Sequence, residues 1–493
     1  MTDHDVPQPR EGCESCQRLL AKNRRLWQRV HRLEADLRVA EWQMAQLRQQ
    51  VDELGGRVNR NSRNSSLPPS ADPPSARRPV SKPPTGRKIG AQKGHKGHFR
   101  KRLPPEQVDQ FVEHRPSQCE HCHQKLPQDG GEIVGRHQVM ELPVRAVSIT
   151  EHRAWNVQCP CCQRHTRGTI APALRLSVVG ERLSAALCLL SSRLHGSRRA
   201  AAELLGEVLG APLSLGSISA RELEMSRALA GDYQKLKARV IKAPVKHVDE
   251  TGWKRRAARF LWMAATNDTA VFHLDRGRGR GALRALLGEQ IKGVICTDRY
   301  CTYEHHPPDR RQLCWSHLKR DFRAQHERDG PAGQWGKQAL TLTRQIFALW
   351  HRFKQKQIVR RGLQRLMAPL KKRLARLLRQ GARSGIGQLS GLCANLLRLE
   401  KALWTFLYVR GMEPTNNHAE RMLRPAVQWR KKSLGCHSQG GCRFAERILS
   451  VIHTSRLRGT SVMDHLQRTL ASYRQELARP STPNSRLPLR LAA

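Results

Sequence analysis

The chain has 493 residues, of which 88 are Lys or Arg and 41 are Asp or Glu, and its formal net charge at pH 7 is +47. An excess of this size favours a nucleic acid as partner, because each phosphate that a cationic side chain neutralises releases counterions. No apolar run reaches the roughly 18 residues of a membrane-spanning helix, and the N-terminus lacks the features of a signal peptide. We therefore expect a cytoplasmic protein of about three domains with no membrane partner.

Residues 17–58 carry apolar side chains at alternating steps of four and three, from Leu26 to Val58. This seam predicts a coiled coil that forms a homodimer or a higher oligomer, and Asn23 at the preceding a-type position favours a parallel dimer in register. The alternative is one amphipathic helix that packs on the rest of the protein. Cys13 and Cys16 precede the seam; they are either free surface thiols or half of a metal site shared between two chains.

Residues 59–104 are rich in Pro, Ser, Gly, Lys and Arg and have no apolar periodicity. Such a segment cannot bury a core, so we predict a disordered basic linker. It is either an inert tether or a strip that lies along DNA phosphates.

Residues 105–172 contain two CxxC pairs and are predicted to form a zinc-binding domain of the ribbon type, with short strands in HQVMEL and VSITEHRAW. The zinc would be structural, because four protein ligands leave no position open for water. Cys161 or a nearby His could replace one ligand, and the alternative is a set of reduced structural cysteines. The predicted Zn²⁺ ligands are Cys119, Cys122, Cys159 and Cys162.

Residues 173–240 are predicted to be a helical DNA-binding domain. A helix that ends at Leu209-Gly210, a turn through Pro212 and a new helix capped by Ser214 or Ser217 resemble a helix-turn-helix, in which the second helix would read DNA. A plain helical connector is the alternative.

Residues 241–325 change to a strand pattern that ends twice in an aspartate. VKHVD is a strand that ends at Asp249, FLWMAATN and AVFHLD form a hairpin, a helix follows, and GVICTD is a buried-type strand that ends at Asp298. This order predicts the opening of a ribonuclease-H-like α/β core, in which the first and fourth strand ends lie side by side.

The rest of that core is expected after a long interruption. Residues 326–410 are predicted to be a helical insertion, and residues 411–475 the second part of the core, with Glu420 on a helix that begins near Asn417. Residues 476–493 are predicted to be a disordered tail. The predicted fold class is therefore multidomain α+β.

Three carboxylates in this arrangement predict a catalytic site that binds Mg²⁺ or Mn²⁺, because hard divalent cations prefer oxygen ligands. Two such ions about 4 Å apart activate a nucleophile and stabilise the leaving oxygen of an in-line displacement at phosphorus. Asp249 would bridge the ions, and Asp298 and Glu420 would each bind one. Glu250 should point to the other side of its strand.

Polar and basic residues around these carboxylates are predicted to contact DNA. Taken singly, each is also explained as a solvated surface group, so the prediction depends on their density. They are His317, Lys319, Arg320, Asn417, Arg421, Arg424, Arg430, Lys431 and Lys432.

Several long motifs resemble the bacterial insertion sequence 66 family of DDE transposases. They are HVDETGW, GVICTDRY, QLCWSHLKRDF, ALWTFL, EPTNNHAERMLRPAVQWRKKSLG and SQGGCRFAERILSVIHT. The resemblance implies a catalytic triad at Asp249, Asp298 and Glu420, a retroviral-integrase-like core, binding to terminal inverted repeats and to target DNA, and two small accessory proteins. It also implies a bacterial, nucleoid-associated location. The loop KRRAARF and the segment CTYEHH depart from the family pattern, which puts local contacts in doubt.

Three functions are compatible with these features. The first is a transposase that cuts the ends of its own element and joins them to target DNA. The second is a catalytically inactive, sequence-specific DNA-binding protein, against which the intact set of three carboxylates argues. The third is a metal-dependent nuclease without joining activity, against which the coiled coil argues, because pairing two element ends requires an oligomer.

Overall fold

The structure is a computed structural model of the 493-residue chain. It describes residues 14–58, 102–127, 129, 132–140, 142, 146–255, 258–433 and 436–479. Internal contacts divide the chain into two compact units. The helical unit comprises Met1–Arg77 and Ser316–Arg398, and the sheet unit comprises Arg78–Trp315 and Leu399–Ala493. Nearly all of the predicted linker, the tail beyond residue 479, and Cys13 lie outside the described residues.

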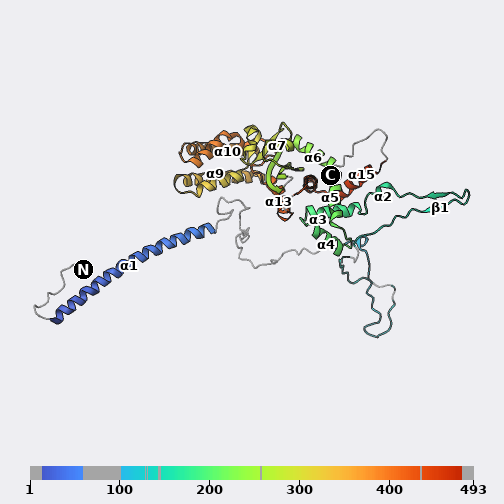
Figure 1. The fold of residues 1–493 in the computed structure, drawn as a ribbon, viewed down its shortest axis with the longest axis horizontal. Helices are drawn as coiled ribbons and strands as arrows, with labels where there is room; N and C mark the ends of the chain where they lie inside the picture. Colours follow the sequence, from blue (N-terminus) through green and yellow to red (C-terminus); the bar gives the residue numbers. More distant parts are fainter. Residues whose placement is uncertain are drawn as a thin grey trace. The chain divides into compact units, whose positions relative to one another are not determined.

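The helical unit contains one long helix from the predicted coiled coil. α1 (Glu14–Val58) is a continuous helix of 45 residues (Figure 1). Its apolar seam faces solvent in the single chain: Leu33, Leu37 and Leu47 are each about 60% exposed. Among the described residues of the seam, these apolar side chains remain exposed.

The remainder of this unit is a set of packed helices: α8 (Trp315–His326, of which Trp315 belongs to the sheet unit), α9 (Gly330–Lys354), α10 (Arg360–Ala382) and α11 (Gly387–Arg398). α9 and α10 lie side by side (Figure 1). The indole N–H of Trp335 donates to the Leu377 carbonyl oxygen at 2.8 Å, which satisfies the polar atom of a buried ring.

The sheet unit is built on five strands in the order β5-β4-β3-β6-β7. β3, β4 and β5 pair antiparallel, whereas β6 pairs parallel with β3 and β7 pairs parallel with β6. The bounds are Val245–Arg255 for β3, Ala258–Ala265 for β4, Ala270–Asp275 for β5, Val294–Thr297 for β6 and Arg311–Leu313 for β7. The predicted strands, the hairpin and the intervening helix α7 (Arg280–Leu287) are therefore present. The predicted end of the first strand at Asp249 was wrong, because β3 continues to Arg255 and pairs with β4 beyond Asp249.

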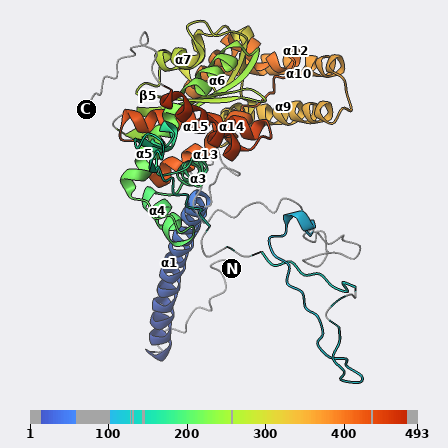
Figure 2. The ribbon, with the colours of Figure 1, turned by 90° about the vertical axis from the view of Figure 1, so that its right-hand side faces the viewer.

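Helices cover both faces of this sheet. Successive residues of a strand point to opposite faces, and apolar side chains on each face pack against a helix layer. On β4, Leu261 and Met263 join a core with α13 (Asn417–Ser433) and α14 (Gln439–Leu457), while Trp262 joins a core with α6 (Ala230–Lys242) and α7. The two helix layers can be followed in Figure 2.

The helices before the sheet add to the first of these cores. They are α3 (Glu181–Ser192), α4 (Arg198–Glu207) and α5 (Leu215–Ala228). α15 (Val462–Ala478) packs against α3, and the short α2 (Pro172–Arg175) contacts α15. Ser214 caps α5, accepting from the Ser217 N–H at 3.1 Å, which decides between the two predicted caps. α15 extends into the first residues of the predicted tail.

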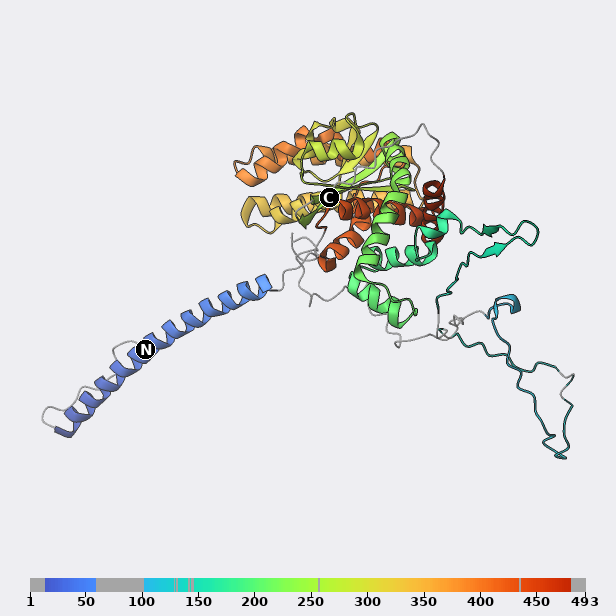
Figure 3. The same cartoon turned by 45° about the vertical axis from the view of Figure 1, so that its right-hand side comes forward.

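The predicted strands in HQVMEL and VSITEHRAW were wrong for the residues that the structure describes there. Their apolar side chains have no core to cover them: Val139 is 76% and Ile149 69% exposed. The strands that do form, β1 (Asn156–Gln158) and β2 (His165–Arg167), make a short hairpin around the second CxxC pair (Figure 3).

The chain leaves and re-enters the sheet unit at neighbouring points. The Trp315 indole N–H donates to the Leu403 carbonyl oxygen at 2.9 Å, and the Phe406 N–H donates to the Gln312 side chain at 2.8 Å. The segment after β7 and the segment that resumes at Leu399 are thus hydrogen-bonded to each other. Between them run the residues 316–398 of the helical unit.

Candidate functional site

Asp249 and Asp298 lie next to each other across two parallel strands. The ladder between β3 and β6 ends with His247 opposite Cys296, and two residues further along both strands come Asp249 and Asp298. Neighbouring strands are only about 4.8 Å apart, so the two carboxylates start from adjacent backbone positions. The parallel pairing of β3 with β6 is what brings them together.

Cys314 extends the same row. The ladder between β6 and β7 ends with Thr297 opposite Leu313, so that Asp298 and Cys314 are the next neighbours. Cys314 is buried, and its Sγ accepts a hydrogen bond from the Asn416 N–H at 3.0 Å. Sequence analysis did not identify this residue, because its place beside Asp298 depends on the strand order.

The buried Asn416 side chain holds the start of α13 against the sheet. Its Nδ2 donates to the Val248 carbonyl oxygen at 2.8 Å, and its Oδ1 lies 3.1 Å from Nδ1 of His247. Because Val248 directly precedes Asp249, these bonds tie the helix that carries Glu420 to the strand that carries Asp249. One side-chain amide therefore holds the start of α13 close to β3.

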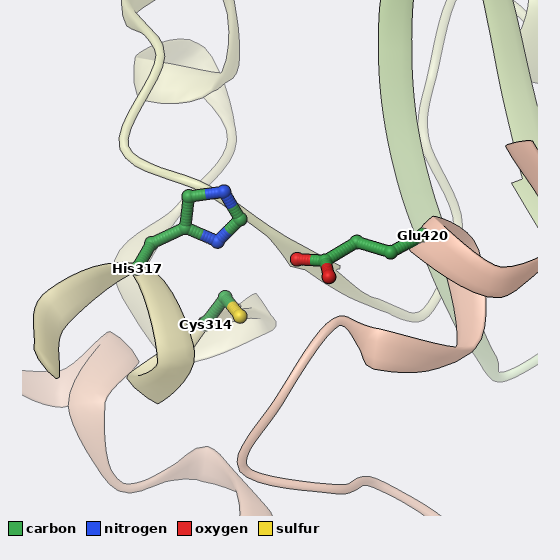
Figure 4. Close-up of side chains that lie close together, drawn as sticks. All are labelled: Cys314, His317 and Glu420. Carbon is green, nitrogen blue, oxygen red and sulfur yellow. The ribbon is translucent and has the colours of Figure 1, made fainter. Parts of the chain in front are cut away.

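Glu420 lies in the first turn of α13, and its N–H donates to the Asn416 carbonyl oxygen at 3.2 Å. A carboxylate oxygen of Glu420 and the Sγ of Cys314 are within 4.8 Å of each other (Figure 4). The figure also labels His317, which belongs to α8 in the helical unit. Asn417, a predicted DNA contact, is exposed at the start of α13.

Electrostatics link the three carboxylates. Burial raises the pKa of Asp249 well above its usual value, and the charges of Glu250, Asp298 and Glu420 raise it further. The Asp249 Oδ1 accepts from the Glu250 N–H at 2.9 Å, and the Asp298 Oδ1 accepts from the Tyr300 N–H at 2.9 Å. Like charges gathered in a partly buried place are stabilised by a bound cation, and the donor oxygens suit Mg²⁺ or Mn²⁺.

Glu250 belongs to a separate network on the other side of β3. Its buried carboxylate accepts from Nε and Nη2 of Arg278 at 3.1 and 2.9 Å and from the Tyr303 hydroxyl. The Arg278 guanidinium stacks 3.9 Å from the centre of the Tyr300 ring. Since the Tyr300 N–H bonds to Asp298, Arg278 braces the loop that positions Asp298. The sequence offers no signal for Arg278, which stands in a run of alternating Arg and Gly.

The predicted DNA contacts divide between the two units. In the sheet unit, Arg421, Arg424, Lys431 and Lys432 of α13 are exposed, whereas Arg430 donates through Nη1 to the Gly252 carbonyl oxygen. In the helical unit, Lys319 is exposed, and His317 and Arg320 are half-buried on α8. Arg430 therefore also anchors α13 to the irregular end of β3.

The two CxxC pairs form similar turns. Cys119 N–H donates to the Gln124 carbonyl oxygen at 2.9 Å, and Cys159 N–H donates to the Arg164 carbonyl oxygen at 2.8 Å. Hydrogen bonds from Cys122 and His121 lower the pKa of Cys119, and those from Cys162 and Cys161 lower the pKa of Cys159. Among the described residues, no three of the predicted zinc ligands have their donor atoms within 4.8 Å of one another.

α5, the predicted DNA-reading helix, packs against α3, α4 and α14. Its Glu222 pairs with Arg198 at 2.7 Å, and its Glu224 pairs with Arg474 at 2.8 Å. Arg227 is an exposed cation near its end. Its role in reading DNA stays a prediction.

Comparison with known proteins gives a family. A model of the Transposase IS66 family matches residues 177–444, which is more than half of the chain, and a model of a family of unknown function matches residues 7–101. The uncharacterized protein y4qI of Sinorhizobium fredii is 24% identical over 242 residues, which span 44% of each chain. No solved structure matches. In the part of the chain that the structure describes, no helix is long and apolar enough to cross a membrane.

Proposed function

Because the chain belongs to the Transposase IS66 family, we propose that it is a DDE transposase that binds the terminal inverted repeats of its own element and catalyses metal-dependent cleavage and strand transfer of DNA. The observation that carries this proposal is the adjacency of Asp249 and Asp298 across β3 and β6, with Glu420 tied to the same strand through Asn416. A transposase acts on DNA, and the charge of +47 suits that substrate.

The sheet order supports a ribonuclease-H-like core. Three antiparallel strands are followed by two that run parallel to the first, and the carboxylates stand at the ends of β6 and within β3. In this reading, Asp249 and Asp298 come from the first and fourth strands of the core. Glu420 comes from the helix that follows the inserted segment.

The residues of the chain have distinct roles in the proposed mechanism. Asp249, Asp298 and Glu420 would hold Mg²⁺ or Mn²⁺, and Asn416 fixes the distance between α13 and β3. The bound ions would activate a water or a DNA 3′-hydroxyl and stabilise the leaving oxygen. Arg421 and Arg424 are exposed within a turn of Glu420, where their guanidinium groups can bind backbone phosphates.

We propose in addition that α1 pairs with a second copy of the chain. Its described apolar side chains are exposed, and a coiled coil with a second copy would bury such a seam with knobs-into-holes packing. A dimer would hold the two ends of one element together, which joining requires and simple cutting does not. Small accessory proteins of the same element are further proposed partners.

The test is strand transfer with labelled, pre-cut element ends, a supercoiled plasmid and Mg²⁺ or Mn²⁺. Wild type is expected to give joined products, whereas Asp249→Ala, Asp298→Ala and Glu420→Ala give none. Glu289→Ala is the matched control, since Glu289 is a carboxylate that is 80% exposed and lies outside the site. Joining that survives in all three site variants would refute the proposal. Cut but unjoined DNA would favour a nuclease.

A shift in DNA mobility without any product, in both wild type and the variants, would favour the inactive DNA-binding protein. Adding the accessory proteins then separates that outcome from an enzyme that needs them. Products that appear only with these proteins would restore the transposase assignment.

A further inference from the structure

A second strongly basic site lies away from the three carboxylates. A cleft of about 890 Å³ opens at the start of β3, between α6, the β4–β5 turn and the segment after α12 (Thr405–Tyr408). Val245, the first residue of β3, lines it, and Asp249 lies four residues further along the same strand. At about 3.3 Å per residue, this separation is about 13 Å.

Most of the charged side chains that line this cleft are cations. Lys235, Arg239 and Lys242 follow one another at steps of four and three on α6, which places them on one face of the helix. Arg410 and Arg458 contribute from two other segments. Asp268 is the carboxylate that lines it. We call this set of six side chains the basic cleft.

Contacts within the protein hold part of the basic cleft in place. Arg239 pairs with the Asp268 carboxylate, and Arg458 donates to the Asp268 carbonyl oxygen at 3.1 Å and to the Thr269 hydroxyl at 3.0 Å. The positive charge nevertheless stays in solvent: Lys235 is 84% and Arg239 58% exposed. A hollow of about 280 Å³ shares Lys235 and Arg458 and adds Arg468 and Asp232, whose carboxylate lies 4.0 Å from Lys235 Nζ.

Five cations from three segments repel one another in the free protein, and a polyanion relieves that repulsion. A concave surface also concentrates the positive potential, which suits a phosphate chain better than a single small anion. The distance of about 13 Å to Asp249 equals about four steps of 3.4 Å along a DNA strand. Phosphates in the basic cleft and a phosphate at the carboxylates can therefore belong to one duplex.

We propose that the basic cleft is a second DNA-backbone site, which holds duplex phosphates a few base pairs from the phosphate that reacts. The site contacts phosphates through side-chain cations and so is independent of sequence. The proposal rests on the proposed function only for the identity of the polyanion as DNA.

The test compares two triple variants in an Asp298→Asn background, which leaves the DNA uncut. The cleft variant carries Lys235→Gln, Lys242→Gln and Arg410→Gln and keeps the two arginines that bond to the β4–β5 turn. The control variant removes three exposed cations from α10, through Lys372→Gln, Arg376→Gln and Arg379→Gln. Thermal melting verifies that both triple variants fold. If the cleft variant does not fold, the single variant Lys242→Gln takes its place.

The measurement is the affinity for a labelled duplex without element sequence, as a function of salt. Each lost phosphate contact reduces the magnitude of the slope of log affinity against log salt concentration by about 0.9. This slope should therefore fall by about 2 to 3 in the cleft variant and by less than 1 in the control variant. The single variant should lose about 0.9. An unchanged slope in the cleft variant, or an equal loss in both triple variants, would overturn the proposal.

Inorganic pyrophosphate at matched ionic strength tests for a small-anion pocket. If pyrophosphate displaces the duplex from the unmodified cleft but not from the cleft variant, the site takes a small anion and the assignment falls. Joining activity separates this proposal from the proposed function. If the wild type never joins DNA, but the salt dependence of its DNA affinity is weakened by the cleft substitutions, only the proposed transposase function is refuted.

Discussion

Glu250 and Arg278 form an ion pair directly behind the candidate site, with 2.9 Å between Oε1 and Nη2. The Glu250 side chain is 1% exposed, so its charge needs the guanidinium and the Tyr303 hydroxyl as partners. Adjacent residues of β3 thus have different tasks. Asp249 faces the carboxylate cluster, while Glu250 fixes the arginine that braces Tyr300 and, through its N–H, Asp298.

Arg278→Ala is therefore expected to weaken metal binding without removing a metal ligand. Losing a side chain that holds a metal-binding carboxylate in position typically lowers metal affinity or activity about 10- to 100-fold. The measurement is the Mg²⁺ concentration for half-maximal joining. Arg278→Lys keeps the charge and should recover part of the loss. An Arg278→Ala protein with an unchanged Mg²⁺ requirement would show that the brace is structural only.

Asn416→Ala should loosen the start of α13. It removes the bond to the Val248 carbonyl oxygen and leaves buried polar atoms unsatisfied, which costs about 1–3 kcal/mol. We expect a lower melting temperature and the loss of joining, measured on the same preparation. Gln428→Ala, an exposed position of the same helix, is the control and should change neither. Full joining activity in Asn416→Ala would contradict the role of this amide.

Leu33→Asp with Leu37→Asp should convert the proposed dimer into a monomer, because two charges would enter the buried seam of the coiled coil. The molar mass from light scattering decides the outcome. Ala35→Asp adds a charge to α1 off the seam and should leave the mass unchanged. If wild type is already a monomer, α1 does not pair through this seam.

Stability should fall between pH 6.5 and about pH 4 because of His453. Burial, together with the charges of Arg193 and Arg456, lowers the pKa of this side chain to about 4, whereas the unfolded chain takes up the proton near its usual pKa of 6.5. The folded-state pKa is depressed, so protons favour unfolding as pH falls, by about 1.4 kcal/mol per pH unit at most. His453→Gln should show a shallower drop in melting temperature from pH 7 to pH 5. An identical drop in both proteins would contradict this assignment.

Zinc analysis by mass spectrometry should find one Zn²⁺ per chain if the two CxxC pairs join into one site. Cys119→Ser and Cys159→Ser should then each lose most of the metal, since a tetrahedral site needs all four thiolates. Loss in only one of the two variants would mean that the pairs do not share an ion. Cys393→Ser, at a buried cysteine of α11, serves as the control.

The strands around the carboxylates could be predicted from sequence because VKHVD and GVICTD each contain an apolar run and Asn267-Asp268 marks the hairpin turn. The end of β3 could not, because its pairing with β4 continues past Asp249 through mostly polar residues to Arg255. The adjacency of Asp249 and Asp298 followed from one topological expectation, that the ends of the first and fourth strands lie side by side, and the ladder between β3 and β6 shows these strands paired.

Other residues of the site could not be found in this way. Arg278, Asn416 and Cys314 matter through partners 28, 168 and 102 residues distant in sequence, and no local pattern encodes such contacts. The strands expected near Val139 and Ile149 failed for a related reason. Local alternation predicts a strand only where a core exists to bury one face, and there the apolar side chains remain exposed.

The hydrogen bond between Trp315 and Leu403 holds the two ends of the segment between them next to each other. A loop closed in this way can change in length or content while its ends stay fixed. The number of residues between Asp298 and Glu420 is therefore free to vary, although their positions in the fold are not. Sequence differences among related transposases should accumulate in this segment. A shortened chain in which a short linker replaces the segment would be a rational minimal enzyme for engineering.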